Sequence, residues 1–259
     1  MAASAPLALV TGGCRRVGAV IAAHLAAQGY ALALHGHSNA DPDNALTEAL
    51  AAHDTPWHGF TADLTDAEAP ARLIADIVAY FGAAPALLVN NASLFEHDTI
   101  DTLDAALLER HWRIHLAAPT LLTRALFQSL DEDGRSSVVH IVDQRVRNPH
   151  GDQLSYTLSK QAMAESIRTL ARATAPRLRV NGVAPGMTLE TEDYAPGQMD
   201  SIAAMMPLQR NSTPQDIAEA VHYLAHAEAV TGQMLHVDGG AHMESYAADF
   251  LNLADSVGG

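Results

Sequence analysis

Cysteine and aromatic residues are scarce in this sequence. The single cysteine among its 259 residues, Cys14, excludes a disulfide within the chain, and such usage fits a reducing compartment. Aromatic residues make up only 5% of the chain against 48% for all hydrophobic residues, so the core must consist mainly of Ala, Leu, Val and Ile. That composition suits a parallel sheet whose two faces are both covered by helices.

Positive charge and long hydrophobic runs are scarce as well. The chain carries 15 Lys and Arg against 30 Asp and Glu, a formal net charge of −15, and so acidic a surface repels nucleic acid. Any phosphate ligand therefore needs a local group of positive charge. No run of about 18 apolar residues could span a membrane, and the N-terminal residues lack the charged region of a signal peptide. We expect a cytoplasmic protein that binds neither nucleic acid nor membrane.

Short apolar runs alternate with longer Ala- and Leu-rich stretches along the whole chain. The short runs predict strands at residues 7–10, 31–35, 57–61, 86–90, 137–142, 179–183 and 234–237. The longer stretches predict helices near 17–29, 43–53, 67–81, 104–129, 154–175 and 214–226. This alternation predicts an α/β fold with one doubly wound parallel sheet of about seven strands and helices on both faces. No linker divides the chain, so we expect a single domain over residues 1–259.

One segment interrupts this alternation. Residues 186–213 are rich in proline, methionine and acidic residues, with a short helical pattern only near 198–205. Ligands in open α/β sheets bind outside the carboxyl ends of the strands, and this segment directly follows the predicted strand at 179–183. We therefore expect a substrate lid, with a mobile surface insertion as the alternative.

A glycine-rich loop follows the first predicted strand and opens a helix. Gly12 permits a tight turn there, and Gly18 lets the helix approach the strand closely, so that backbone N–H groups can face a pyrophosphate. An ordinary strand-to-helix turn is the alternative, but the strand before and the Ala-rich helix after it favour a Rossmann-type dinucleotide site. The loop residues expected to contact the dinucleotide are Gly12, Cys14, Arg15, Arg16 and Val17.

The end of the second predicted strand carries no acidic residue. Sites that prefer NAD usually have an acid about 20 residues beyond the loop, where it binds the ribose 2′-hydroxyl. This chain instead has His37, Ser38 and Asn39, and its first acid there is Asp41. These side chains and the nearby Arg15 would favour a 2′-phosphate, so we expect NADPH as the cofactor.

Tyr156 and Lys160 are four residues apart in a predicted helix, so both project from one face. A tyrosine with the ordinary pKa of about 10 is a poor acid–base catalyst at neutral pH. We expect the nearby ammonium to lower the pKa of Tyr156, so that the phenol exchanges a proton with the substrate. Asp143 ends the strand before this helix. A helix-surface pair without function is the alternative when the Tyr–Lys spacing is taken alone.

Together these motifs resemble the short-chain dehydrogenase/reductase family over essentially the whole chain. The residues that carry the resemblance are Thr11-Gly12 to Gly18, Ala62-Asp63-Leu64, Asn90-Asn91-Ala92, Tyr156 with Lys160, Asn181-Gly182-Val183-Ala184-Pro185-Gly186, and Val237-Asp238-Gly239-Gly240.

The resemblance implies a role for several of these residues. Asp63 should hydrogen-bond the adenine, Asn90 should line the cofactor pocket, and Lys160 should hold the nicotinamide ribose. The other cofactor contacts expected from the resemblance are Leu64, Ala92, Tyr156, Pro185, Gly186 and Thr188. A homotetramer is also implied, with helices 104–129 and 154–175 at one dimer interface.

Three positions depart from most of the family. Arg16 stands where most members have glycine, His115 where they have asparagine, and Asp143 where they have serine. The combination resembles the pteridine-reductase subgroup, and within it the bacterial dihydromonapterin and dihydrofolate reductases. The stretch Asn91-Ala92-Ser93-Leu94-Phe95 also resembles the one whose phenylalanine stacks on the pterin ring.

These departures are chemically consistent with a pterin substrate. Phe95 can stack on the flat ring, while Arg16 and Ser93 bind its polar edge. Asp143 can orient Tyr156, or a water, to bring a proton to nitrogen when a C=N bond is reduced. We therefore expect an NADPH-dependent reductase that converts a dihydropterin (dihydromonapterin, dihydrobiopterin or dihydrofolate) to the tetrahydro form, with no metal. The alternatives are a carbonyl (ketone) reductase and a non-catalytic NADP-binding protein.

Some roles stay open at this point. Phe95 could be a core aromatic residue, and Asp143 could cap the next segment. We prefer to see His115 as a hydrogen-bonded core histidine in the structural role of the asparagine, rather than as a catalyst. Arg145 lies either near the substrate or in an exposed salt bridge, and residues 241–259 either cover a neighbouring subunit's site or extend freely.

Overall fold

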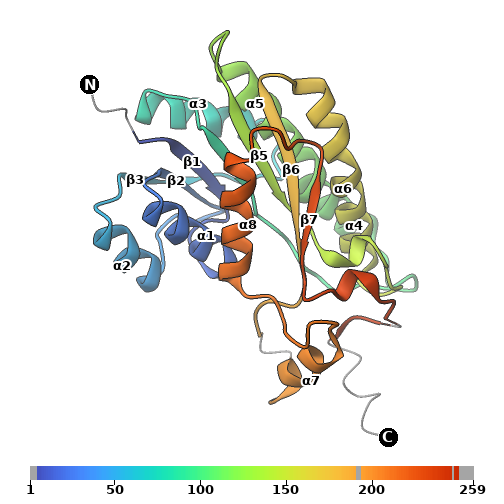
Figure 1. The fold of residues 1–259 in the computed structure, drawn as a ribbon. Coiled ribbons are helices and arrows are strands. Elements are labelled where there is room, and N and C mark those ends of the chain that lie inside the picture. The colour runs from blue at the N-terminus through green and yellow to red at the C-terminus, as the bar shows by residue number, and fades with distance from the viewer. Residues whose placement is uncertain (1–4, 191–193, 247, 251–259) are drawn as a thin grey trace, which may run out of the picture.

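The computed structural model describes residues 5–190, 194–246 and 248–250. Seven parallel strands form one sheet in the order β3-β2-β1-β4-β5-β6-β7, as Figure 1 shows. The strands are β1 (Leu7–Thr11), β2 (Ala31–Gly36), β3 (Trp57–Thr61), β4 (Leu87–Asn90), β5 (Ser136–Ile141), β6 (Leu178–Pro185) and β7 (Met234–Val237). The predicted doubly wound, Rossmann-type sheet is confirmed.

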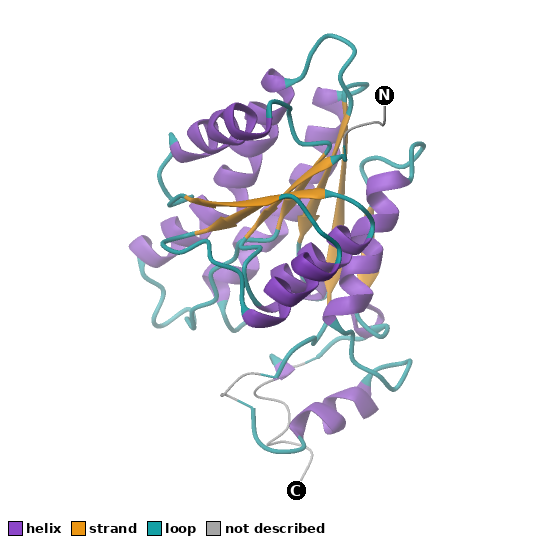
Figure 2. Cartoon of the chain, turned by 90° about the vertical axis from the view of Figure 1, so that its left-hand side faces the viewer, coloured by secondary structure: helices purple, strands orange, loops and turns teal. Residues whose placement is uncertain are grey.

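Helices cover both faces of the sheet (Figure 2). They are α1 (Arg16–Ala27), α2 (Asn44–Ala52), α3 (Ala69–Phe81), α4 (Ala105–Trp112), α5 (Ala118–Ser129), α6 (Leu154–Thr174), α7 (Gln198–Met205) and α8 (Pro214–His226). Strand β1 shows why two layers are needed, because Ala8 and Val10 enter the core beneath α1 and α8, whereas Leu7 and Leu9 enter the core beneath α3, α5 and α6. Both faces of each inner strand are apolar, so both must be covered.

The long helix expected at 104–129 is not regular throughout. A π-helical segment, Arg113–Ala117, joins α4 to α5 and carries the fully buried His115 in its middle. Segments of π-helix occur mostly as single turns inside α-helices and frequently at functional sites. The helix predicted near 104–129 is therefore present, and its hydrogen-bond pattern changes at the position where the chain carries an unusual histidine.

The strand order creates a crevice at the carboxyl edge of the sheet. Strand β1 pairs with β2 on one side and with β4 on the other, so the connections that leave β1 and β4 diverge to opposite faces. Ligands of open α/β sheets bind at such a switch point. The sequence motifs that end β1, β4, β5 and β6 all reach this edge.

The segment between β6 and α8 and the segment after β7 pack against each other beyond the same edge, where α7 lies below the sheet in Figure 1. Ile202 and Met206 form a small apolar cluster there with Ala241 and Phe250. Within the suggested lid 186–213, residues 191–193 lie outside the described residues, and so do 251–259 of the C-terminal stretch. Among the helices described, none has the length and apolar character needed to cross a membrane.

Candidate active site

A cleft of about 400 Å³ opens at the carboxyl ends of β1, β4, β5 and β6. A hollow of about 280 Å³ shares Gly12 and Arg15 with it and lies at the end of β2. The cleft is lined by Gly12, Arg15, Arg16, Val17, Gly18, Asn91, Ala92, Ser93, Phe95, Ile141, Val142, Asp143, Tyr156, Lys160, Pro185, Gly186, Thr188 and Ile217. Candidate residues from five separate stretches of the chain therefore lie around one space.

Asp143 holds Tyr156 by a direct hydrogen bond. The phenol Oη of Tyr156 donates to Asp143 Oδ2 at 2.9 Å. The other carboxylate oxygen, Oδ1, accepts the backbone N–H of Arg145 at 2.8 Å and thereby caps the short helical turn Gln144–Val146. Asp143 therefore contacts Tyr156 and caps the next segment at the same time, because each of its oxygens has its own partner. The backbone cap fixes the carboxylate in the orientation that the tyrosine needs.

Lys160 lies beneath the ring of Tyr156. Its ammonium donates to the carbonyl of Ile141 at 2.8 Å and lies 5.6 Å from the ring centroid of Tyr156. Burial lowers the pKa of Lys160 to about 8, while Asp143 acts to raise it and Arg145 to lower it further. The side chain is therefore close to its titration point at neutral pH.

The pKa of Tyr156 is not lowered, contrary to what we expected from the nearby Lys160. The pKa of Tyr156 is raised well above its ordinary value, first because the phenol is buried and next because the negative charge of Asp143 opposes a phenolate. Arg145 acts in the opposite sense and does not overcome these two effects. Tyr156 therefore keeps its proton at neutral pH, as a proton donor must.

His115 is a buried, neutral histidine that shapes the loop after β4. The N–H of Leu94 donates to His115 Nε2 at 3.2 Å, so the ring proton lies on Nδ1, which is 2.8 Å from Ser159 Oγ. Ser93 Oγ is 2.9 Å from the same Nε2. Burial, followed by the charge of Lys160, lowers the pKa of His115 well below its ordinary value. These contacts agree with the hydrogen-bonded core histidine preferred from the sequence.

Phe95 is not a core residue. Its side chain is 49% exposed, and its ring meets the ring of Tyr156 edge-to-face with a centroid distance of 4.8 Å. The alternative of a plain core aromatic is therefore wrong. An exposed aromatic face beside a proton donor is a suitable platform for a flat heterocycle.

The loop after β1 fits a pyrophosphate. Gly12 has a φ of +60°, and a Cβ on Gly18 would lie 2.0 Å from the carbonyl oxygen of Gly12, so both positions require glycine. No side chain caps the N-terminus of α1, and its first turn holds no acid. The positive end of the helix dipole, with Arg15 and Arg16 beside it, thus faces the cleft as an anion site.

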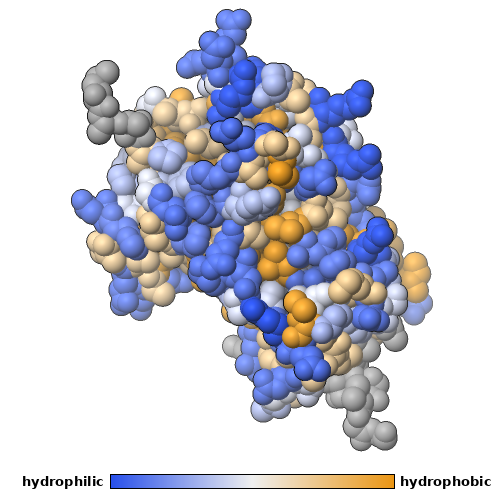
Figure 3. All heavy atoms as spheres, in the orientation of Figure 1, coloured by the Kyte–Doolittle hydropathy of each residue, from blue (hydrophilic) through white to orange (hydrophobic). Residues whose placement is uncertain are grey.

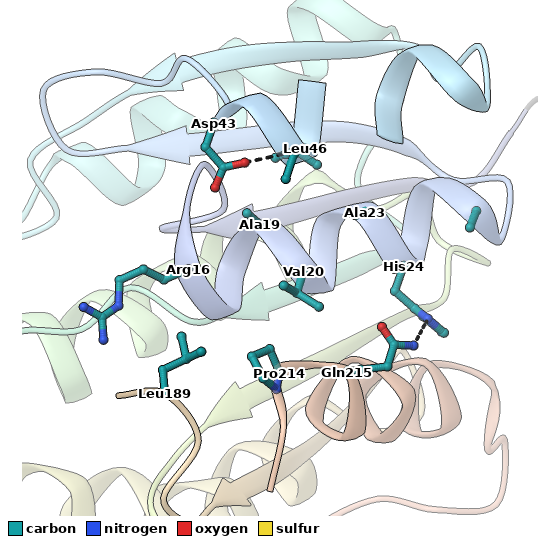
Figure 4. A pocket seen from close by; sticks show the side chains of 12 residues that line it. Arg16, Ala19, Val20, Ala23, His24, Asp43, Leu46, Leu189, Pro214 and Gln215 are labelled. Carbon is teal, nitrogen blue, oxygen red and sulfur yellow. Dashed lines mark hydrogen bonds between the residues drawn. The ribbon is translucent and has the colours of Figure 1, made fainter. Parts of the chain in front are cut away.

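Arg16 adopts a backbone conformation that favours glycine. Its φ is +55°, and such a conformation costs a non-glycine residue about 1–3 kcal/mol. The side chain extends from the start of α1 toward Leu189 (Figure 4), at the boundary between the cleft and an apolar groove along α1 that Val20 and Pro214 also line. Strain of this kind is enriched at functional sites, and Arg16 lines the cleft.

The end of β2 forms the hollow expected to take a 2′-phosphate. His37, Ser38 and Asn39 line it together with Cys14 and Arg15. Sequence reasoning missed the contribution of His35, whose Nδ1 accepts the N–H of Gly12 at 3.2 Å while its Nε2 lies 3.0 Å from the carbonyl of Ala62. The sequence feature that could have indicated this role is a histidine directly before Gly36 at the end of an apolar strand.

Thr11 and Asn91 were quoted only as parts of motifs, yet they hold β1 to the loop after β4. Thr11 Oγ1 accepts the backbone N–H groups of Asn91 and Ala92 at 2.9 and 3.0 Å. The Asn91 amide donates to the carbonyls of Thr11 and Gly12 at 3.0 and 3.1 Å. These hydrogen bonds therefore hold the glycine-rich loop after β1 against the loop after β4 that carries Ser93 and Phe95.

The remaining cofactor candidates lie at different depths. Thr188 Oγ1 donates to the carbonyl of Gly186 at 2.8 Å beside the cleft, and Asp63 is on the surface, 3.7 Å from His37. Leu64 belongs to the apolar core. Asn90 is buried behind the cleft with its amide 3.3 Å from His140, so that Asn91 lines the wall at this point.

Residues 14–242 match the family model described as enoyl-(acyl carrier protein) reductase. The chain belongs to the short-chain dehydrogenase/reductase family. This short-chain reductase is 30% identical to pteridine reductase 1 of Leishmania tarentolae, over 92% of its own length and 96% of the relative's. It is also 30% identical to a 3-oxoacyl-acyl-carrier-protein reductase of Staphylococcus aureus, over 91% of its length and 98% of the relative's.

Solved structures also resemble this short-chain reductase, and one of them has a higher sequence identity than these relatives. The structure of alternative dihydrofolate reductase 1 from Brucella canis, complexed with NADP, is 37% identical, with a TM-score of 0.84 over 94% of this chain and 96% of that one. A short-chain dehydrogenase/reductase from Serratia marcescens is 29% identical, with a TM-score of 0.81. The relatives thus include reductases of both pterins and ketones, within one family and one fold.

Proposed function

We propose that this short-chain reductase uses NADPH to reduce a dihydropterin, such as dihydromonapterin, dihydrobiopterin or dihydrofolate, to its tetrahydro form. The observation that carries the proposal is the hydrogen bond between Tyr156 and Asp143 next to the exposed ring of Phe95. The likeness to pteridine reductase 1 from Leishmania tarentolae and to the Brucella canis alternative dihydrofolate reductase supports it.

The chain offers a suitable group for each part of the cofactor. The uncapped start of α1 would hold the pyrophosphate, and Lys160 the nicotinamide ribose. Arg15, Ser38 and Asn39 would bind the 2′-phosphate, where NAD would find no carboxylate for its ribose. When bound, NADPH supplies the hydride that the reduction needs. The NADP complex of the Brucella canis relative supports this choice of cofactor.

The side chains of the cleft would position the pterin and provide its proton. Phe95 would stack on the ring, with Arg16 and Ser93 at its polar edge. As the hydride adds to carbon, the electron pair of the C=N bond moves to nitrogen, which takes the proton of Tyr156 Oη. The phenolate left behind is stabilised by Lys160, whose ammonium lies 5.6 Å from the ring centroid.

The charge state of the site keeps a proton donor in place for the reduction. The raised pKa of Tyr156 keeps its proton available at neutral pH, and Asp143 orients the phenol at 2.9 Å before the substrate arrives. A reductase acting on C=N needs a proton donor of this kind. A non-catalytic NADP-binding protein would have no use for the Asp143–Tyr156–Lys160 arrangement.

Reduction of a small ketone is the second candidate. The Tyr156 and Lys160 pair would serve a carbonyl oxygen equally well, and the Staphylococcus aureus relative is a ketoacyl reductase. Asp143 and the exposed Phe95 favour the pterin, because a carbonyl needs neither an aromatic platform nor a carboxylate beside the proton donor.

We also propose that the protein works as a cytoplasmic homotetramer. Trp112 on α4 and Leu158 on α6 are exposed apolar side chains. Hydrophobic side chains also gather over β7 and toward α7 (Figure 3), where Leu208, Leu235 and Met243 are exposed. Surfaces of this kind mark contacts between proteins. Light scattering would test the assembly, and a monomer mass would refute it.

The proposed activity is tested by NADPH oxidation with purified protein. Dihydromonapterin, dihydrobiopterin and dihydrofolate are each offered alongside a small ketone, with NADPH and then NADH. We expect turnover of at least one pterin and a higher kcat/KM with NADPH. The control is Tyr156→Phe, which should bind NADPH as tightly as the wild type but lose turnover. No turnover of any pterin would refute the proposal.

A further inference from the structure

Arg145 is a buried cation that the proposed reaction does not use directly. Only 5% of the residue is exposed, although the sequence left open whether it forms a surface salt bridge. Its Nη1 donates to Gln153 Oε1 at 2.6 Å, its Nη2 donates to Asp249 Oδ2, and its Nε lies 3.4 Å from Asp143 Oδ1. A buried guanidinium with several fixed partners has one orientation.

That orientation places the guanidinium over two aromatic rings of the candidate active site. Its central carbon lies 5.1 Å from the ring centroid of Tyr156 and 5.7 Å from that of Phe95. Cation–π contacts at these distances stabilise the positions of both rings. The same cation therefore touches the proton donor, the expected stacking platform and the carboxylate that orients the donor.

The partner Asp249 belongs to the C-terminal segment, which folds back over this wall. Its backbone N–H donates to Asp152 Oδ2 at 2.9 Å, and Asn148 Nδ2 donates to the carbonyl of His242 at 2.7 Å. The next residue, Phe250, enters the apolar cluster with Ile202 of α7. Asp249 and Phe250 thus connect α7, in the suggested lid, to the guanidinium of Arg145 beside Tyr156.

We propose that Arg145 is a positioning residue, and that its ion pair with Asp249 makes the C-terminal segment a working part of the active site. The pair holds Phe95 and Tyr156 in the arrangement that the substrate meets. That the substrate is a dihydropterin rests on the proposed function. The positioning of Phe95 and Tyr156 by Arg145 does not depend on which substrate is reduced.

The charges around Arg145 explain why Asp249 matters. Two carboxylates, Asp143 and Asp249, flank the guanidinium, and the ammonium of Lys160 lies 5.6 Å from the ring centroid of Tyr156. The other titratable groups near these rings are His97, His111 and His115. Without the charge of Asp249, Asp143 is the carboxylate that still flanks the guanidinium, and we expect the guanidinium to move toward it. The hydrogen-bond geometry at Tyr156 then changes.

The test compares Asp249→Asn with Asp249→Glu and Glu244→Gln. The first removes the charge and keeps the shape, the second keeps the charge, and the third removes a charge from an exposed side chain of the same segment. Kinetics are measured with whichever acceptor the wild type reduces, at a temperature where circular dichroism shows every variant folded. NADPH affinity is measured separately by fluorescence.

We expect Asp249→Asn to lower kcat/KM for the acceptor by at least about tenfold, since hydrogen bonds to charged groups contribute that much. The affinity for NADPH should stay unchanged, Asp249→Glu should recover most of the activity, and Glu244→Gln should match the wild type. Equal kcat/KM in Asp249→Asn and wild type would overturn the inference, whereas missing pterin turnover would overturn only the proposed function. A crystal structure of Asp249→Asn gives an answer without any substrate, because unmoved Arg145 and Phe95 side chains would refute the positioning role.

Discussion

The phenol of Tyr156 donates its hydrogen bond to Asp143 Oδ2 at 2.9 Å, and the backbone N–H of Arg145 fixes the other oxygen of the same carboxylate. The resemblance to the family implies that Asp143 replaces a serine. A serine hydroxyl can itself donate to a carbonyl oxygen, whereas an ionised carboxylate only accepts. The carboxylate therefore acts on Tyr156, and through it on the substrate.

Replacing Asp143 separates the two candidate reactions. In Asp143→Ser we expect kcat/KM for a dihydropterin to fall by about 10²–10⁴, the usual contribution of a positioned acid–base group. Activity with a small ketone should be kept or increased, because serine restores the arrangement typical of the family. Steady-state kinetics with both substrates give the answer, and equal losses for both would contradict it.

We expect Arg16 to lower the free energy of unfolding and to strengthen binding of the pterin. Arg16→Gly removes a non-glycine residue from a φ of +55°, so we expect unfolding free energy to rise by about 0.5–1 kcal/mol while KM for the pterin increases. The measurements are urea denaturation and initial rates. Asp54→Gly is the matched control, since Asp54 is exposed and has a φ of +48°. It should leave KM unchanged. A lower stability in Arg16→Gly would show that the side chain contributes more than its backbone costs.

The activity should have an alkaline limit set by Lys160. Burial lowers the pKa of this ammonium to about 8, and the charged form is the one that stabilises the phenolate. We therefore expect kcat/KM to fall as pH rises above about 8. In Lys160→Arg the side chain stays charged, so the fall should disappear from the profile even though the rate is lower. A fall that stays at the same pH in this variant would assign it to another group.

Stability should decrease in mild acid because of His140. This residue is fully buried in β5, and burial, with the charge of Lys160, lowers its pKa to about 3. Below the unfolded pKa of about 6.5 the unfolded chain binds a proton that the folded chain excludes. Stability is thus complete above that pH and declines on acidification toward the folded pKa, by about 2 kcal/mol at pH 5.

Urea denaturation at pH 7 and pH 5 checks this difference. His140→Gln keeps an amide for Asn90, whose Nδ2 lies 3.3 Å from the His140 ring nitrogen, and should lose about 2 kcal/mol less than the wild type between the two pH values. The exposed His53 provides the control in His53→Gln. If both variants follow the wild type, His140 is not the group responsible.

Periodicity and local chemistry made the fold predictable from the sequence. Apolar runs such as 87–90 have no alternation, which identifies strands buried on both faces, and the glycines at 12 and 18 mark the turn where α1 begins. The spacing of Tyr156 and Lys160 depends only on helix geometry. The π-helical segment around His115 could not be read in this way, because it has no such periodicity or local motif in the sequence.

The sequence by itself determined the family, the doubly wound sheet and which side chains meet at its carboxyl edge, because these follow from motifs on short, regular elements. Only the tertiary structure decided the protonation states of the side chains in the candidate active site and which distant residues contact them. Burial reverses the expected pKa direction of Tyr156, and Arg145 meets Asp249, 104 residues away along the chain. The pKa of Tyr156 and the contact between Arg145 and Asp249 depend on which atoms exclude water and on which distant charges come together. Neither can be read from residues that are neighbours in the sequence.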